Sequence, residues 1–360
     1  MSLNFIDVEY LITFLLLICC LIGGSKRRAC KIEVKSWSLL AVDKTTSDVM
    51  KAIACVFVLM GHWATNLLNS GESLGIVAKV SWHTTANIAL CWFMYFSGYG
   101  LSLKDNDCNA IRIDWWKRVK KIYLPLFVVS LSSIIVCMVL PDIGLEKTWA
   151  NFNKNVHLIH SFEISKLSSL LMSAFGLFDW YVSCILIFYS IFYLTLYLSR
   201  KFKINHTILL SMGMLVYNVI AYGAFGWEQA HYFRFPWIFM LGHLVAVYKR
   251  NHIIVNILTI SIFIPTILIH DKVTITCFVL AVIGISFFAV IGKRFYFGGG
   301  VLLFLGSISY FFYLSHIRIG YTLLAYTNIH SMIFWIIITI IVSIIVKAFI
   351  SKLKKEKALY

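Results

Sequence analysis

The sequence predicts an all-α protein, a polytopic bundle of about eleven transmembrane helices in a single membrane domain. Of its 360 residues, 60% are hydrophobic and only 13% are charged, whereas soluble domains carry about 25% charged residues. The mean hydropathy of +0.83 is too apolar for a water-soluble core. The apolar residues also fall into separate runs of about 20 residues, which is the length that a membrane-spanning helix needs.

Short polar segments separate the apolar runs. The runs cover residues 8–24, 48–68, 84–103, 122–140, 180–199, 205–225, 233–248, 253–270, 273–292, 299–320 and 331–350. The shortest, 233–248, fits a bilayer only if the membrane thins locally or one end tilts. Residues 167–178 are apolar but too short to span, so we expect a re-entrant or interfacial piece on the outer face. Residues 111–121 have the composition of a helix lying in the headgroup layer.

The net charge of +16 is concentrated in clusters between the apolar runs, which argues for membrane topology rather than nucleic-acid binding. With the N-terminus outside and the C-terminus cytoplasmic, all but seven of the 32 lysines and arginines lie in cytoplasmic segments or at their edge. The seven are Lys79, Lys147, Lys154, Lys166, Arg234, Lys272 and Arg318. Basic loops stay inside as a rule, and a membrane lipid surface is the partner that such loops meet.

The N-terminal run is predicted to be an uncleaved anchor. Asp7 and Glu9 precede or begin it and Lys26 follows, whereas a signal peptide carries its positive charge in front. Residues 1–42 therefore form an anchor span with a basic cytoplasmic loop, and residues 43–350 form the core. The nine cysteines show no disulfide framework and no metal-type spacing, so no metal is expected.

The second run holds the residues most indicative of chemistry. Ser47 or Asp48 is expected to cap its helix, Lys51 follows near the inner surface, and His62 lies eleven residues further on. At about 1.5 Å per residue, the separation is about 16 Å, which places His62 past the midplane. Ionisable groups inside a bilayer are functional candidates by default. The alternatives are a packing histidine and a lysine that snorkels to the surface.

The tenth run ends on His316, which the same topology places toward the outer face, at a depth similar to that of His62. Two histidines at one depth on different helices are able to line one cavity. A purely structural role for His316 is the alternative reading.

Several short motifs occur in one order along the chain. They are Asp48-x2-Lys51-x10-His62, Phe93-x2-Phe96-Ser97-Gly98-Tyr99-Gly100, Lys117-Arg118-x2-Lys121-x3-Pro125, Trp180-Tyr181, Phe239-x2-Gly242 and Leu305-Gly306-x-Ile308-Ser309-Tyr310-x2-Tyr313-Leu314-x-His316. Over about residues 43–350 this arrangement resembles acyltransferase family 3, whose members are integral membrane enzymes. Family members usually carry an arginine where this chain has Lys51, and lysine keeps the charge without the bidentate geometry.

The resemblance implies an O-acetyltransferase of the bacterial cytoplasmic (inner) membrane. It would use cytoplasmic acetyl-CoA as acyl donor and a hydroxyl of an extracytoplasmic sugar or polysaccharide as acceptor. His62 would serve as general base or acyl carrier, with His316 and Tyr310 as orienting or proton-transfer partners. The CoA phosphates would meet basic residues, namely Lys51, Lys117, Arg118, Lys120 and Lys121. Trp180 and Tyr181 would border the acceptor side and stack on a sugar, unless they belong to an interfacial aromatic belt.

Other readings stay open at this stage. A polytopic transporter of polysaccharide or lipid-linked sugar shares the composition, although the chain shows no internal repeat of the kind common in transporters. The acyl group could be larger than acetyl, the acceptor could be a lipid or an amine, and a scaffold with a decayed site is a third reading. The oligomeric state is open, with a homodimer among the options.

Overall fold

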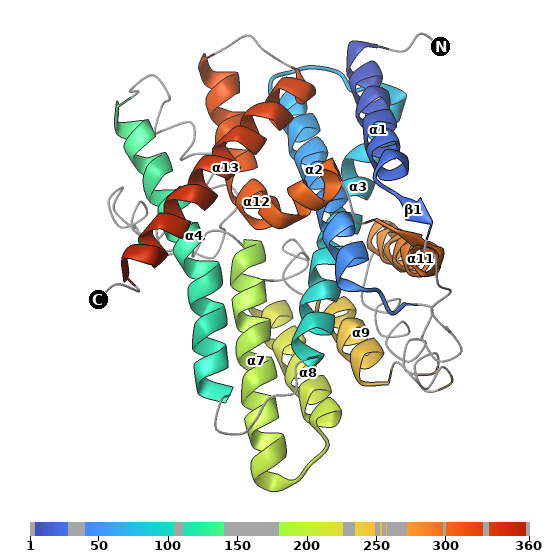
Figure 1. Cartoon of the computed structure of the whole chain (residues 1–360), viewed down its shortest axis with the longest axis vertical. Coiled ribbons are helices and arrows are strands. Elements are labelled where there is room, and N and C mark those ends of the chain that lie inside the picture. The colour runs from blue at the N-terminus through green and yellow to red at the C-terminus, as the bar shows by residue number, and fades with distance from the viewer. Residues whose placement is uncertain are drawn as a thin grey trace. The chain divides into compact units, whose positions relative to one another are not determined.

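The computed structural model describes residues 4–27, 40–103, 111–139, 180–225, 235–248, 253, 257, 272–297, 300–326 and 331–357. Helices dominate these residues, which confirms the all-α prediction (Figure 1). The exception is a short antiparallel ladder that pairs β1 (Lys26–Arg27) with β2 (Phe295–Tyr296).

The described helices follow the apolar runs closely. They are α1 (Phe5–Gly23), α2 (Lys44–Asn69), α3 (Ile76–Ser102), α4 (Ile111–Val139), α7 (Trp180–Phe202), α8 (His206–Phe225), α9 (Pro236–Val247), α11 (Lys272–Arg294), α12 (Val301–Tyr326) and α13 (Met332–Lys357). The run at 253–270 and the re-entrant piece at 167–178 lie largely or wholly outside the described residues.

Six of the described helices are long and apolar enough to cross a membrane. They are Phe5–Gly23, Lys44–Asn69, Trp180–Phe202, Ile275–Arg294, Val301–Gly320 and Met332–Leu353. A multi-spanning membrane protein is therefore the right class, while the count of eleven spans and the sides of the two termini stay predictions. The apolar window of Lys44–Asn69 is 72% buried, against 22% for Phe5–Gly23, so α2 is a central helix and α1 a peripheral one.

The chain divides into two compact units, which are described separately. The first comprises Met1–Asp105, Arg234–Tyr313 and Ser331–Ile336. The second comprises Asn106–Phe233, Leu314–His330 and Ile337–Tyr360. In the C-terminal part of the chain, the boundaries between the units fall within α12 and within α13, each of which is one continuous helix.

Helices α2 and α3 form the antiparallel centre of the first unit. The Trp82 indole N–H donates to the Thr65 hydroxyl over 2.8 Å, and Gly61 lies directly against Ala86. Further along, the Lys51 ammonium lies 5.7 Å from the centre of the Phe96 ring. These three contacts pair successively earlier residues of α2 with successively later residues of α3. The two helices therefore pack against each other along most of their length.

Helix α9 crosses α3 at two glycines, Gly98 and Gly242. A Cβ on Gly98 would collide with the Phe239 carbonyl, and one on Gly242 would collide with the Tyr95 carbonyl. Small residues allow helix backbones to approach this closely in a membrane protein. At this crossing Ser102 Oγ lies 2.7 Å from Nδ1 of the buried His243, which joins the two helices by a polar contact.

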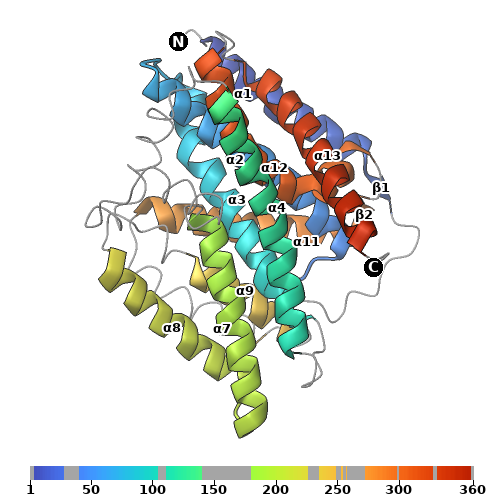
Figure 2. The same ribbon diagram turned by 90° about the vertical axis from the view of Figure 1, so that its left-hand side faces the viewer.

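The second unit contains α4, α7 and α8. The Trp115 indole N–H donates to the Ser190 hydroxyl (3.2 Å) and the Arg118 guanidinium to the Tyr193 hydroxyl (3.0 Å), which tie α4 to α7. Helices α7 and α8 pack as a pair (Figure 2). Residues 111–121 are helical and continuous with the apolar run that follows them, because α4 is one helix from Ile111 to Val139; their place in the headgroup layer stays a prediction.

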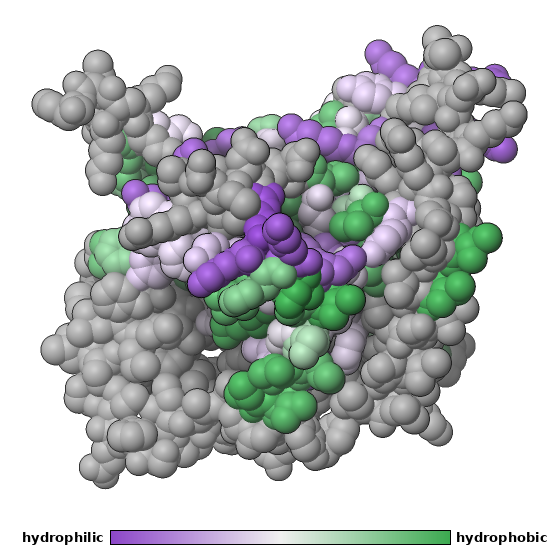
Figure 3. All heavy atoms as spheres, turned by 90° about the horizontal axis from the view of Figure 1, so that it is seen from below, coloured by the Kyte–Doolittle hydropathy of each residue, from purple (hydrophilic) through white to green (hydrophobic). Residues whose placement is uncertain are grey.

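Large apolar side chains are exposed on the outside of several helices, as expected of surfaces that face lipid. On α8 they are Ile208, Met212, Leu215, Val216, Val219 and Ile220, and on α1 they include Phe5, Leu15, Leu16 and Ile22. Figure 3 shows hydrophobic groups (green) beside hydrophilic ones (purple) on one face of the molecule.

Candidate functional site

The candidate site is built on α2, which begins one turn earlier than the sequence suggests. The helix N-cap is Asp43, whose carboxylate accepts from the Thr46 amide over 2.7 Å. The expectation that Ser47 or Asp48 caps the helix is therefore wrong. An aspartate at the N-cap satisfies an amide that the first helical turn leaves without a partner. Asp48 is instead free to pair with Lys51 at 3.2 Å.

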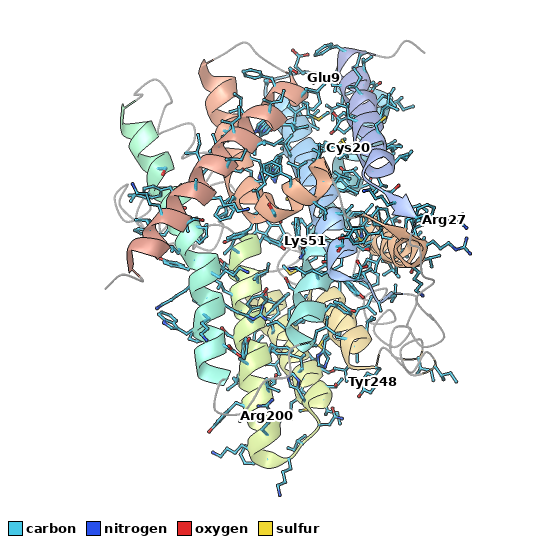
Figure 4. All side chains as sticks on the ribbon, in the orientation of Figure 1. Glu9, Cys20, Arg27, Lys51, Arg200 and Tyr248 are labelled. Atoms are coloured by element: carbon cyan, nitrogen blue, oxygen red, sulfur yellow. The ribbon has the colours of Figure 1, made fainter. Side chains whose placement is uncertain are left out.

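Lys51, Cys55 and His62 emerge from one face of α2. Eleven residues make about three helical turns, so the side chains of Lys51 and His62 leave the helix only about 20° apart. Cys55 lies between them, one turn after Lys51 and nearly two turns before His62. Figure 4 labels Lys51 on α2, where its side chain is partly exposed. The face thus carries a cation at one end and an imidazole about 16 Å further along.

The turn that carries His62 is held on several sides. The Tyr10 hydroxyl of α1 donates to the Met60 carbonyl over 2.9 Å, and Gly61 lies against α3. Thr65, one turn later, accepts from Trp82 and donates to the Gly61 carbonyl over 3.0 Å. His62 itself is half-buried, so the imidazole is shielded by the bundle but not sealed within it.

Helix α12 meets the same face of α2. The Cys55 thiol donates to the Ser309 carbonyl over 3.1 Å, and a Cβ on Gly306 would collide with the Asp48 backbone. Tyr310 follows Ser309 directly and is half-buried. The first unit therefore carries three of the predicted site residues, Lys51, His62 and Tyr310, on two helices that are in direct contact.

The first unit also has a basic end that the sequence reasoning did not connect to the site. Thr46 in the first turn of α2 lies against Gly292 of α11, and α11 ends on Lys293 and Arg294. The ladder that follows pairs β2 with Lys26–Arg27. These four basic residues therefore lie at the end where α2 begins, and Figure 4 shows Arg27 pointing away from the helices. The sequence does not predict that these four residues lie together, because the β1–β2 pairing is what brings them to the same end of the unit.

The other predicted site residues belong to the second unit. His316 is fully buried on α12. Arg118 is bound to Tyr193, and Lys120 lies 5.1 Å from the centre of the exposed Trp116 ring. The remaining two basic residues of this group, Lys117 and Lys121, are exposed on α4.

Trp180 and Tyr181 form the first turn of α7, with ring centroids 5.9 Å apart and nearly perpendicular. Tyr181 is buried and Trp180 half-buried, so Trp180 is the better placed of the two to meet a ligand.

Arg318 is a residue that the sequence reasoning counted only as charge. It donates to the Leu314 carbonyl (2.6 Å) and to the Ser130 hydroxyl (3.0 Å), and it is half-buried two residues beyond His316. An arginine inside an apolar helix is costly and is usually retained for a reason. In the sequence, the only indication that Arg318 belongs near the site is its position two residues after His316.

Comparison with known protein families decides the class. A family model described as an acyltransferase domain matches residues 45–352, which is most of the chain and includes every site residue predicted from the sequence. The chain belongs to acyltransferase family 3. The comparisons with curated proteins and with solved structures gave no match.

This acyltransferase is an integral membrane enzyme, and the choice between enzyme and transporter is settled in favour of the enzyme. In the described part of the chain, no group of three or more histidine, cysteine, aspartate or glutamate side chains is placed to hold a metal ion. The face of α2 offers an imidazole as base or nucleophile and an ammonium as an anion partner. An imidazole is suited to general-base or nucleophilic catalysis, and an ammonium is suited to binding an anion.

Proposed function

We propose that this acyltransferase moves an acetyl group from cytoplasmic acetyl-CoA to a hydroxyl of an extracytoplasmic sugar or polysaccharide. The observation that carries the proposal is the shared face of Lys51 and His62 on α2. An anion held at Lys51 is about 16 Å from His62 along the helix, which is comparable to the reach of an extended pantetheine arm. The donor then needs to extend only its thioester toward His62, and the nucleotide stays on the cytoplasmic side.

The basic end of the first unit supports a phosphate-rich donor. Lys293 and Arg294 end α11 beside the start of α2, and Lys26 and Arg27 pair with the strand that follows. Ammonium and guanidinium groups suit phosphate oxygens. We propose these four residues with Lys51 as phosphate contacts, in addition to the basic residues of α4 that the sequence suggested, which are Lys117, Arg118, Lys120 and Lys121.

The proposed reaction places His62 at the acceptor hydroxyl. His62 removes the hydroxyl proton while the oxygen attacks the thioester carbonyl carbon. The carbon–sulfur bond breaks, the proton passes from the imidazole to the CoA sulfur, and an acetyl ester and free CoA result. In the covalent variant the His62 nitrogen attacks the thioester carbonyl carbon, the carbon–sulfur bond breaks, and CoA leaves with the imidazole N–H proton. The sugar oxygen then attacks the acetyl carbon, the carbon–nitrogen bond breaks, and the hydroxyl proton returns to the imidazole.

Tyr310 and His316 are proposed as orienting or proton-transfer partners. Tyr310 lies beside the Cys55–Ser309 contact on α12. His316 ends the sequence motif that also contains Ser309 and Tyr310. Trp180 is the proposed stacking surface for an acceptor sugar, and Tyr181 supports it by edge-to-face contact.

The bacterial inner membrane is the proposed location because its two sides hold acetyl-CoA and surface glycans separately.

Sealed membrane vesicles of both orientations test the proposal. With labelled acetyl-CoA supplied outside, inside-out vesicles should form labelled acetyl esters on glycan in the lumen, and right-side-out vesicles should not. His206→Gln, which removes a histidine of α8 outside the candidate site, should match the wild type in this assay. Equal labelling in both orientations, or labelling of lipid alone, would contradict the proposed donor side or acceptor.

A further inference from the structure

Helix α1 lies outside the segment that matches the family, which begins at residue 45. Its side chains nevertheless make specific contacts with α2. Tyr10 is fully buried, donates to the Met60 carbonyl over 2.9 Å, and its ring lies 5.7 Å from that of Trp63. Met60 and Trp63 flank His62 in sequence. Tyr10 therefore contacts the turn that carries His62 both at a residue that precedes His62 in sequence and at a residue that follows it.

A second contact lies about one turn before Met60 on α2. The rings of Phe14 and Phe57 meet edge to face, with centroids 5.9 Å apart. Phe57 emerges about 140° away from His62 around the helix, and Trp63 about 100° away. Helix α1 therefore packs on the side of α2 that is turned away from His62. Fixing that side sets the rotation of α2 and hence the direction in which His62 points.

Helix α1 is in turn anchored by two buried carboxylates. Asp7 accepts from the Ala78 amide (3.0 Å) in the first turn of α3. Glu9 accepts from the Met332 amide and the Ser331 hydroxyl, both at 2.6 Å, at the start of α13. Asp7 and Glu9 are 2% and 4% exposed. Carboxylates are favoured at helix N-termini because free amides and the helix dipole meet them there.

We propose that α1 is a built-in support for the turn of α2 that carries His62, with Tyr10 as a positioning residue. The inference rests on the proposed catalytic role of His62 and adds a requirement for a helix outside the family match. Asp7 and Glu9 lock α1 to α3 and α13, Tyr10 and Phe14 bear on the back of α2, and His62 faces the opposite side. The N-terminal helix is then part of the working enzyme as well as a membrane anchor.

Tyr10→Phe tests the proposal because it removes one hydroxyl and keeps the ring. In the purified full-length enzyme, hydrogen exchange of the amides of Met60–Asn66 should become about threefold faster or more, since the Met60 carbonyl loses a partner. The kcat for acetyl transfer should fall about tenfold, while the KM for acetyl-CoA stays within about twofold. The donor is held at Lys51, about three turns away.

Leu15→Ala is the matched control on the same helix, because Leu15 is 60% exposed and faces away from the bundle. Its kcat, KM and exchange rates should equal those of the wild type. Phe14→Leu keeps the Tyr10 hydroxyl and should give a smaller change in the same direction.

Two results would overturn the proposal: wild-type exchange in Tyr10→Phe, or faster exchange with wild-type kcat. His62→Ala, measured in parallel, separates this inference from the proposed function. Turnover by His62→Ala at the wild-type rate would remove the proposed function. The exchange comparison would still report whether Tyr10 supports the turn, because it does not depend on catalysis.

Discussion

The thiol of Cys55 donates to the carbonyl oxygen of Ser309 over 3.1 Å, joining α2 to α12. Cys55 is buried and shares its face of α2 with Lys51 and His62. We expect Cys55→Ser to keep the donor and to retain kcat within about threefold. Cys55→Leu should lose at least about tenfold in kcat, because extra volume in a packed helix contact costs about 1–3 kcal/mol and displaces a helix. Wild-type turnover by the purified Cys55→Leu enzyme would show that this contact does not set the site.

Gly98 and Gly100 offer a matched pair within one motif. A Cβ on Gly98 meets the backbone of α9, whereas nothing lies within 4 Å of the position that a Cβ on Gly100 would take. Gly98→Ala should lower thermal stability in detergent by several degrees, since helix backbones must separate, at a cost of about 2 kcal/mol or more. Gly100→Ala should be neutral or stabilising by up to about 1 kcal/mol, because alanine favours helix. Equal melting temperatures for the two variants would contradict the described α3–α9 crossing.

Glu9 is predicted to contribute more to the stability of the fold than its place in a peripheral helix suggests. Glu9→Ala leaves the Met332 amide and the Ser331 hydroxyl without this acceptor, which should cost about 1–3 kcal/mol. Glu9→Gln keeps one acceptor oxygen and should cost less. The melting temperatures of the purified proteins should decrease in the order wild type, Glu9→Gln, Glu9→Ala. Glu72→Ala, at an exposed position after α2, is the control and should match the wild type.

Lys51 is predicted to act on donor binding. Lys51→Met should raise the KM for acetyl-CoA about tenfold, equivalent to about 1.4 kcal/mol, and kcat should change less. The KM difference should shrink as salt is added, because salt screens the attraction. Lys51→Arg should stay active, since arginine keeps the charge. Lys79→Met, near the start of α3 at an exposed position, is the charge-matched control, and an equal rise in its KM would contradict a specific role for Lys51.

The sequence was sufficient for the helices but not for their termini and partners. Apolar runs of bilayer length predict α1, α2, α7, α11, α12 and α13 because burial of apolar surface dominates there. The start of α2 was misplaced because Asp43, Ser47 and Asp48 are all good N-caps, and tertiary packing chose the first. The continuity of α4 through its basic segment was missed because composition describes a surface helix and a helix extension equally well.

The site was predicted in part. The resemblance singled out Lys51 and His62, and helical spacing alone puts them on one face of α2. In the sequence, Asp7 and Glu9 indicate the orientation of the first span, whereas in the structure they accept from amides at the starts of α3 and α13. No local pattern reveals such a role, because the acceptor and the helix start lie about 70 or more than 300 residues apart in sequence. The role of Tyr10 was hidden for the same reason.

The central claim is that His62 carries out the acyl transfer, and it is tested most directly by turnover per folded enzyme. Purified wild type, His62→Ala and His62→Gln are compared for release of free CoA and formation of acetyl ester on a sugar acceptor, with folding checked by thermal unfolding. We predict that both variants fold and that each loses at least about a hundredfold in kcat, as removal of a general base or nucleophile does. Ester formation by folded His62→Ala at the wild-type rate would contradict the account.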